Sequence, residues 1–140
     1  MILDDLAMYL EAQGLGTRRV TIFAGRIPED APGSGVADGI IVLFAVPGLG
    51  PEHVHDIVGP AVSQPVVQVR VRGAAVPGGY AAMWSTAEQA YKVLDSVRNQ
   101  TINGVFYRHI LALQSPFGLG EDQYNRPTLV FNVRCARGEP

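Results

Sequence analysis

The sequence predicts an α+β fold in which two helices pack on one face of a mainly antiparallel or mixed sheet of about five to six strands. Strand-like segments follow one another without helices between them, and only two segments have the apolar spacing of a helix. Hydrophobic residues make up 47% of the chain, which is the composition of a globular protein. The 140 residues predict a single domain over residues 1–140, because domains most often contain roughly 100–150 residues.

Two segments predict the helices. Residues 2–13 repeat leucine at i, i+3 and i+7, carry two aspartates in the first turn, and are ended by Gly14. Residues 80–99 keep the same apolar spacing after a Pro-Gly-Gly break. The apolar stripe of this second helix consists of Tyr80, Met83, Trp84, Ala87, Tyr91, Leu94 and Val97.

Three segments between these helices predict strands. Residues 20–25 form a short strand that alternates Val20, Ile22 and Ala24 with their neighbours, and residues 39–46 are a continuous apolar run typical of a buried strand. Residues 66–73 are the clearest strand, with valines at 67, 69 and 71 on one face. The opposite face carries polar residues, so it meets solvent or a partner. These polar residues are Gln68, Arg70 and Arg72.

The C-terminal part predicts a hairpin and two long strands. Asn103-Gly104 suits the positive φ angles of a type I′ turn, with a short strand before it. Residues 105–114 and 127–137 are the long strand candidates. Residues 26–38, 47–65 and 115–126 have the composition of loops.

Charge and composition exclude several classes of protein. The formal net charge of −2 is not that of a basic nucleic-acid binder. A lone Cys135 excludes an internal disulfide framework and a cysteine-based zinc site. The apolar runs are shorter than the roughly 20 residues of a membrane span, and the first residues lack the early positive charge of a secretory signal.

The residues that carry chemistry predict no catalytic, cofactor or metal site. The only lysine, Lys92, follows no phosphate-binding loop, and Cys135 lies on the apolar face of a strand, where it acts as a small hydrophobe. The acidic pairs are adjacent in sequence, so they do not face each other across a cleft as catalytic carboxylates do.

One histidine cluster leaves a metal site open as an alternative. In an extended segment, His53 and His55 would point the same way and could bind one zinc, with Asp56 or His109 completing the ligands. The cluster falls in a loop rich in proline and glycine, which favours a solvated role instead.

The ordered set of motifs resembles one known family, the tail terminator (minor capsid or tail completion) proteins of long-tailed bacteriophages. Each motif alone is weak, but together they cover nearly the whole chain in order. The matching stretches are Phe23-Ala24-Gly25-Arg26, Pro47-Gly48, Pro51-Glu52-His53, residues 65–73, Tyr80-Ala81-Ala82, Arg98-Asn99, Ile102-Asn103-Gly104-Val105, Tyr107, Gln114-Ser115-Pro116, Asp122, Arg126-Pro127 and Phe131-Asn132.

The resemblance implies a virion protein without a catalyst. Such proteins form a hexameric ring that caps the tail tube, ends tail polymerisation and offers a joining surface for the head, while DNA passes through the bore without sequence-specific binding. Implied partners are further copies of the chain, the tail tube protein and a head-completion (stopper) protein, and no membrane. The resemblance also implies that the protein is made in the host cytoplasm and is then incorporated at the tail–head junction of the virion.

The assembly contacts expected from the strand face and the motifs are Arg26, His53, His55, Gln68, Arg70, Arg72, Gln114, Asp122 and Arg126. We expect the three long loops to contact neighbouring subunits. The alternatives are a neck or head-completion (stopper) protein and, in a different class, a small metal-dependent enzyme using the His-x-His-Asp loop.

Overall fold

The computed structural model describes residues 2–26, 36–46, 52–53 and 60–138. The elements are α1 (Ile2–Ala12), β1 (Ile22–Ala24), β2 (Ile40–Val46), β3 (Glu52–His53), β4 (Pro60–Ser63), β5 (Val66–Arg72), α2 (Gly79–Asp95), β6 (Arg98–Ile102), β7 (Val105–Ala112), β8 (Phe117–Glu121) and β9 (Pro127–Gly138). No helix in these ranges is long and apolar enough to cross a membrane.

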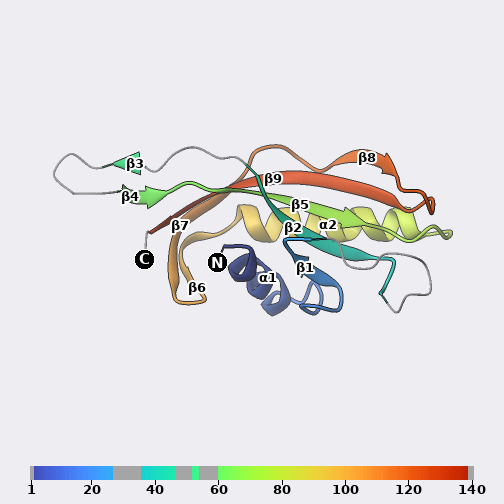
Figure 1. Cartoon of the computed structure of the whole chain (residues 1–140), viewed down its shortest axis with the longest axis horizontal. Helices are drawn as coiled ribbons and strands as arrows, with labels where there is room; N and C mark the ends of the chain where they lie inside the picture. The colour runs from blue at the N-terminus through green and yellow to red at the C-terminus, as the bar shows by residue number, and fades with distance from the viewer. Residues whose placement is uncertain (1, 27–35, 47–51, 54–59, 139–140) are drawn as a thin grey trace.

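The twelve-residue strand β9 lies at the centre of the sheet (Figure 1). It pairs antiparallel with β5 over residues 128–134, with β8 over 127–130 and with β7 over 133–137. Because a strand has two edges, the overlapping registers put β7 and β8 on the edge opposite β5. β4 pairs with residues 137–138, next to β5. Each end of β9 therefore holds two different neighbours.

The rest of the sheet extends outward from these pairs. At one end the strand order is β1-β2-β5-β9-β8, and at the other it is β3-β4-β9-β7-β6. β1 runs parallel to β2, while the other described strand pairs are antiparallel. The sheet is therefore mixed, which is one of the two arrangements predicted from the sequence.

Both helices pack on one face of this sheet and close a single core (Figure 1). The alternation predicted for β5 is confirmed, since Val67, Val69 and Val71 are buried beneath the helices. The β9 residues Leu129 and Phe131 continue the same apolar face. Burying this face contributes most of the folding free energy, at roughly 25 cal/mol per Å² of apolar surface.

The structure corrects the predicted element boundaries. In the described part of the chain the sheet has nine strands where about five to six were predicted, because β3, β4 and β8 fall in segments predicted as loops. Glycine and proline in these segments hid strands that form by pairing, β4 and β8 with β9 and β3 with β4. α2 ends at Asp95 and not at residue 99, since Arg98 already begins β6. The predicted Asn103-Gly104 turn is confirmed, with φ of 50° and 78° between β6 and β7.

A buried carboxylate ties the first helix to this hairpin. Asp5 is 1% exposed and accepts hydrogen bonds from Tyr107 Oη at 2.7 Å and from Asn103 Nδ2 at 2.9 Å. Arg137 Nη1 of β9 lies 3.7 Å from the same carboxylate. Burial and this carboxylate raise the pKa of Tyr107, so its hydroxyl stays protonated and donates the hydrogen bond to Asp5. The β6–β7 turn, β7 and β9 are thus joined to the start of α1.

We predict that Asp5→Ala lowers the free energy of unfolding by about 3 kcal/mol, because it leaves buried donors without an acceptor. The matched control is Asp4→Ala, since Asp4 is exposed in the same helical turn. Urea denaturation followed by circular dichroism measures both variants. Equal effects of the two substitutions would contradict the assigned role of Asp5.

Candidate assembly surface

The predicted polar strand face lies on the side of the sheet opposite the helices. Here Arg70 donates from Nη2 to Gln68 Oε1 at 3.0 Å, and its guanidinium lies 5.2 Å from the ring centre of Phe44 on β2. Arg70 Nε is buried and makes no hydrogen bond among the described residues. Arg70 is therefore held flat along the sheet with one donor unused.

The side chain of Arg72 on the same strand is instead buried and forms hydrogen bonds within the chain. It is 7% exposed and donates from Nε to the Asp38 carbonyl at 2.8 Å and from Nη2 to the Ala37 carbonyl at 3.1 Å. These bonds fix the chain just before β2 against the end of β5.

Arg126 anchors the same region from the start of β9. Its side chain is 1% exposed and pairs with Asp122 at 2.8 Å and with Asp38 at 3.1 Å, while its guanidinium lies 4.9 Å from the ring centre of Tyr124. The contact role predicted for Arg72 and Arg126 stays a prediction, but both side chains already have partners within the chain.

Asp122 organises the turn between β8 and β9. Its Oδ1 accepts from the backbone N–H of Tyr124 at 2.9 Å and of Arg126 at 3.0 Å. Burial alone would raise the pKa of Asp122, but these N–H groups and the guanidinium outweigh it, so the pKa lies below its ordinary value. The turn therefore depends on an ionised carboxylate.

The remaining predicted contact residues are separated along the sheet. Arg26 is exposed after β1, and Gln114 accepts from the backbone N–H of Asn132 at 3.3 Å. His53 belongs to β3, while His55 lies outside the described residues. Among the described candidates, the structure therefore brings Gln68 and Arg70 together on one face and Asp122 and Arg126 together in one turn.

The groups considered for catalysis or metal binding have ordinary structural surroundings. No three His, Cys, Asp or Glu residues in the described ranges could hold a metal ion, and Asp56 lies outside those ranges. Burial and three nearby arginines lower the pKa of His109. Burial raises the pKa of Cys135 to about 12, so the thiol stays protonated at neutral pH.

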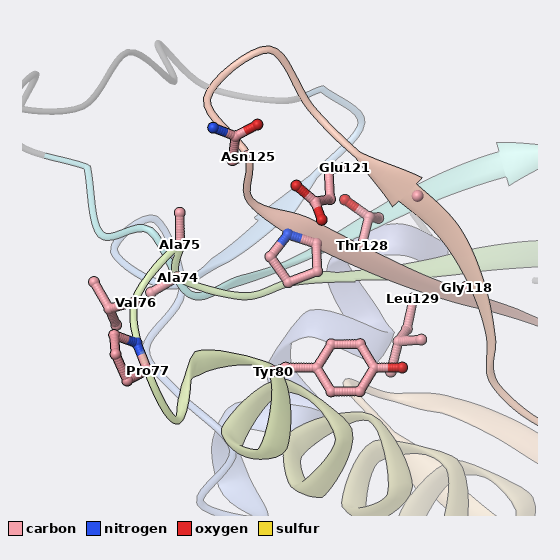
Figure 2. A pocket seen from close by; sticks show the side chains of 12 residues that line it. Ala74, Ala75, Val76, Pro77, Tyr80, Gly118, Glu121, Asn125, Thr128 and Leu129 are labelled. Carbon is pink, nitrogen blue, oxygen red and sulfur yellow. The ribbon is translucent and has the colours of Figure 1, made fainter.

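Sequence reasoning missed two exposed apolar surfaces. Val20, predicted within a strand, is 57% exposed in the turn before β1. Tyr80, predicted in the apolar stripe of the second helix, is 59% exposed and lines a groove between α2 and β8 (Figure 2). Periodicity could not reveal this, because it assigns a face without showing where the neighbouring element ends.

One protein family matches most of the chain. Residues 9–137 match the sequence model of a family described as bacteriophage tail terminator protein. The chain belongs to the bacteriophage tail terminator family. Membership gives it a structural role in the phage tail.

Solved structures agree with this fold of the tail terminator. A chain from the virion of a native gene transfer agent particle aligns with a TM-score of 0.59 at 17% identity, covering 96% of this chain and 92% of that one. A second chain, which carries no functional description, aligns with a TM-score of 0.53 at 16% identity and covers 99% and 92%. At these identities the likeness concerns the fold alone. Comparison with curated proteins gave no significant match.

We predict that Asp122→Asn destabilises the tail terminator by about 1 kcal/mol at pH 7 and by less in acid. Because the folded-state pKa of Asp122 is lowered, its contribution is complete above the ordinary value of 3.8 and is lost as the pH falls through the folded-state pKa. Urea titrations at pH 7, 4 and 2.5 measure the difference from the parent protein. A difference that stays constant over this range would rule out the ionised-carboxylate turn.

Proposed function

We propose that the chain is a structural virion protein that forms a ring capping the phage tail tube, ends tail polymerisation and provides the head–tail joining surface. The family match over residues 9–137 carries this proposal. The chain acts as a single domain of residues 1–140 and needs no catalyst.

The physical features of the fold are consistent with a ring subunit. Both helices and the sheet share one core, so the subunit is rigid. The two ends of the strand order expose different surfaces, and association between different surfaces makes a ring when the rotation closes. Six copies would form the homohexamer, with a formal charge of −12, which is six times the −2 of one chain. A bore that is not strongly basic would let DNA slide, because each added cation–phosphate contact tightens binding.

The proposed partners follow from this position. The ring contacts the tail tube protein on one side and a head-completion (stopper) protein on the other, at the tail–head junction of the virion. The protein is made in the host cytoplasm before it is incorporated.

Native mass spectrometry of the purified chain tests the ring, and it reads bound metal in the same spectrum. We expect a metal-free hexamer, or a monomer that assembles when purified tail tubes are added. A chain that stays single in the presence of tail tubes contradicts the proposal. Binding to portal-side rings without binding tail tubes would favour the neck or head-completion role, and one bound zinc would favour the enzyme built on His53, His55 and Asp56.

The unused donor of Arg70 gives a sharper prediction about the polar sheet face. We expect Arg70→Ala to lower the free energy of unfolding by no more than about 1 kcal/mol and to impair subunit association or tail capping. Arg72→Ala should lower the melting temperature more, since Arg72 binds two backbone carbonyls within the fold.

The matched control is Arg108→Ala, because Arg108 is exposed on β7. Tail length in an assembly reaction, measured by electron microscopy, is the readout. Normal tail length with Arg70→Ala would remove Arg70 from the assembly surface.

A further inference from the structure

We propose that neighbouring subunits associate head to tail by inserting the turn at residues 17–21 of one copy into the groove beside Tyr80 of the next copy. This inference rests on the proposed ring and names the two surfaces that make it. We call them the Val20 turn and the Tyr80 groove.

The Val20 turn is a hydrogen-bonded turn that presents an exposed apolar side chain directly after two arginines. Val20 is exposed and follows Arg18 and Arg19 directly. Arg19 has a φ of 68°, a conformation that non-glycine residues rarely adopt. An exposed valine held in this way is ready to bury its side chain in a partner without further ordering.

Local hydrogen bonds hold the turn in this shape. The backbone N–H groups of Val20 and Thr21 donate to the Thr17 carbonyl at 3.1 and 2.9 Å, and that of Arg19 donates to the Ile22 carbonyl at 2.8 Å. Arg18 is fixed to α1, because Glu11 accepts from its backbone N–H at 2.8 Å and from its Nε at 3.2 Å. The backbone bond above all, with the side-chain bond and the nearby guanidinium, lowers the pKa of Glu11 against the opposing effect of burial. Arg19 makes no side-chain hydrogen bond or ion pair among the described residues.

The Tyr80 groove has the complementary chemistry. It has a volume of about 510 Å³, with walls that include Val76 and Pro77 before α2, Tyr80 on α2 and Leu129 on β9. Figure 2 shows the Tyr80 ring reaching from the start of α2 toward Leu129, with Glu121 at the opposite wall. Val76 and Tyr80 are 60% and 59% exposed, which is a high exposure for apolar side chains this close together.

Glu121 gives the groove its only charged side chain among the described lining residues. It is exposed at the end of β8, and its carboxylate makes no hydrogen bond or ion pair in the part of the chain that the structure describes. An apolar groove with one free carboxylate fits an apolar knob flanked by a free arginine. A second copy of the chain supplies both through its Val20 turn, with Arg19 opposite Glu121.

The positions of the two surfaces allow this pairing to repeat. The Val20 turn precedes β1 and the Tyr80 groove borders β8, and these strands end the order β1-β2-β5-β9-β8. A subunit can therefore offer its turn to one neighbour and its groove to another. Because the two surfaces lie at opposite ends of this strand order, each copy can join two different neighbours in a heterologous contact. Such a contact forms a ring when the rotation between subunits closes.

Charge exchange between the two surfaces tests the pairing. We expect Arg19→Glu and Glu121→Arg each to weaken association by about tenfold or more, and the double variant to recover most of it, because unlike charges again face each other. Val20→Asp should abolish the ring. The matched controls are Arg108→Glu and Phe106→Asp on β7, where Phe106 is 49% exposed. Native mass spectrometry reads the subunit number, with tail tubes added if the parent protein assembles only on them, and circular dichroism verifies folding.

Cysteine cross-linking provides a second test that retains the fold. In the presence of a mild oxidant, the double variant Val20→Cys with Val76→Cys should give a ladder of covalent oligomers up to the closed ring. Neither single variant should do so, and neither should Val20→Cys combined with Phe106→Cys. The native Cys135 does not interfere, because it is buried and its pKa is raised to about 12.

The outcomes separate this inference from the proposed function. A parent protein that forms rings, together with charge and cysteine variants that behave like the controls, would overturn the head-to-tail pairing and leave the ring intact. Cross-linking of Val20→Cys alone would indicate a two-fold contact and would also overturn it. A parent protein that stays single even on tail tubes would overturn the proposed function, and the pairing with it.

Discussion

The backbone ladder along β9 is the constraint on which the rest of the structure depends. Both edges of this strand are occupied at both ends, by β5 and β8 at one end and by β4 and β7 at the other. A register shift of one residue would turn Leu129 and Phe131 out of the core and bring Asn132 into it. The apolar face of β9 therefore sets the register of four neighbours, and through them the positions of both helices.

Buried hydrogen bonds and ion pairs then fix the segments that the ladder leaves free. Asp5 fastens α1 to the β6–β7 hairpin, and Arg126 fastens Asp38, the residue before Gly39 and β2, to the turn between β8 and β9. A buried charge is tolerated only where partners satisfy it. These side chains therefore restrict the chain to one arrangement.

Assembly depends on what this rigid framework leaves exposed. The family relationship assigns a structural role in the phage tail, and the surfaces available for it are the polar sheet face around Arg70 and the two ends of the strand order. Exposed apolar residues lie at both of those ends, beside Arg19 at one and Glu121 at the other, whose side chains have no partner among the described residues. This arrangement explains how one chain can present two unlike surfaces without a second domain.

The sequence by itself determined the fold class, both helices, the two faces of β5 and the Asn103-Gly104 hairpin, because each is encoded by local periodicity or turn chemistry. It also determined the family, through an ordered set of weak motifs. Only the tertiary structure revealed β4 and β8, since those segments become strands by pairing with β9. It also showed that Arg72 is buried while Arg70 is only part-buried, although both alternate with valine on the same strand. The difference arises because burial depends on which distant segment covers a side chain. Val20 and Tyr80 are exposed for the related reason that no neighbouring element in the described part of the chain covers them, and local sequence does not encode which side chains a distant element will cover.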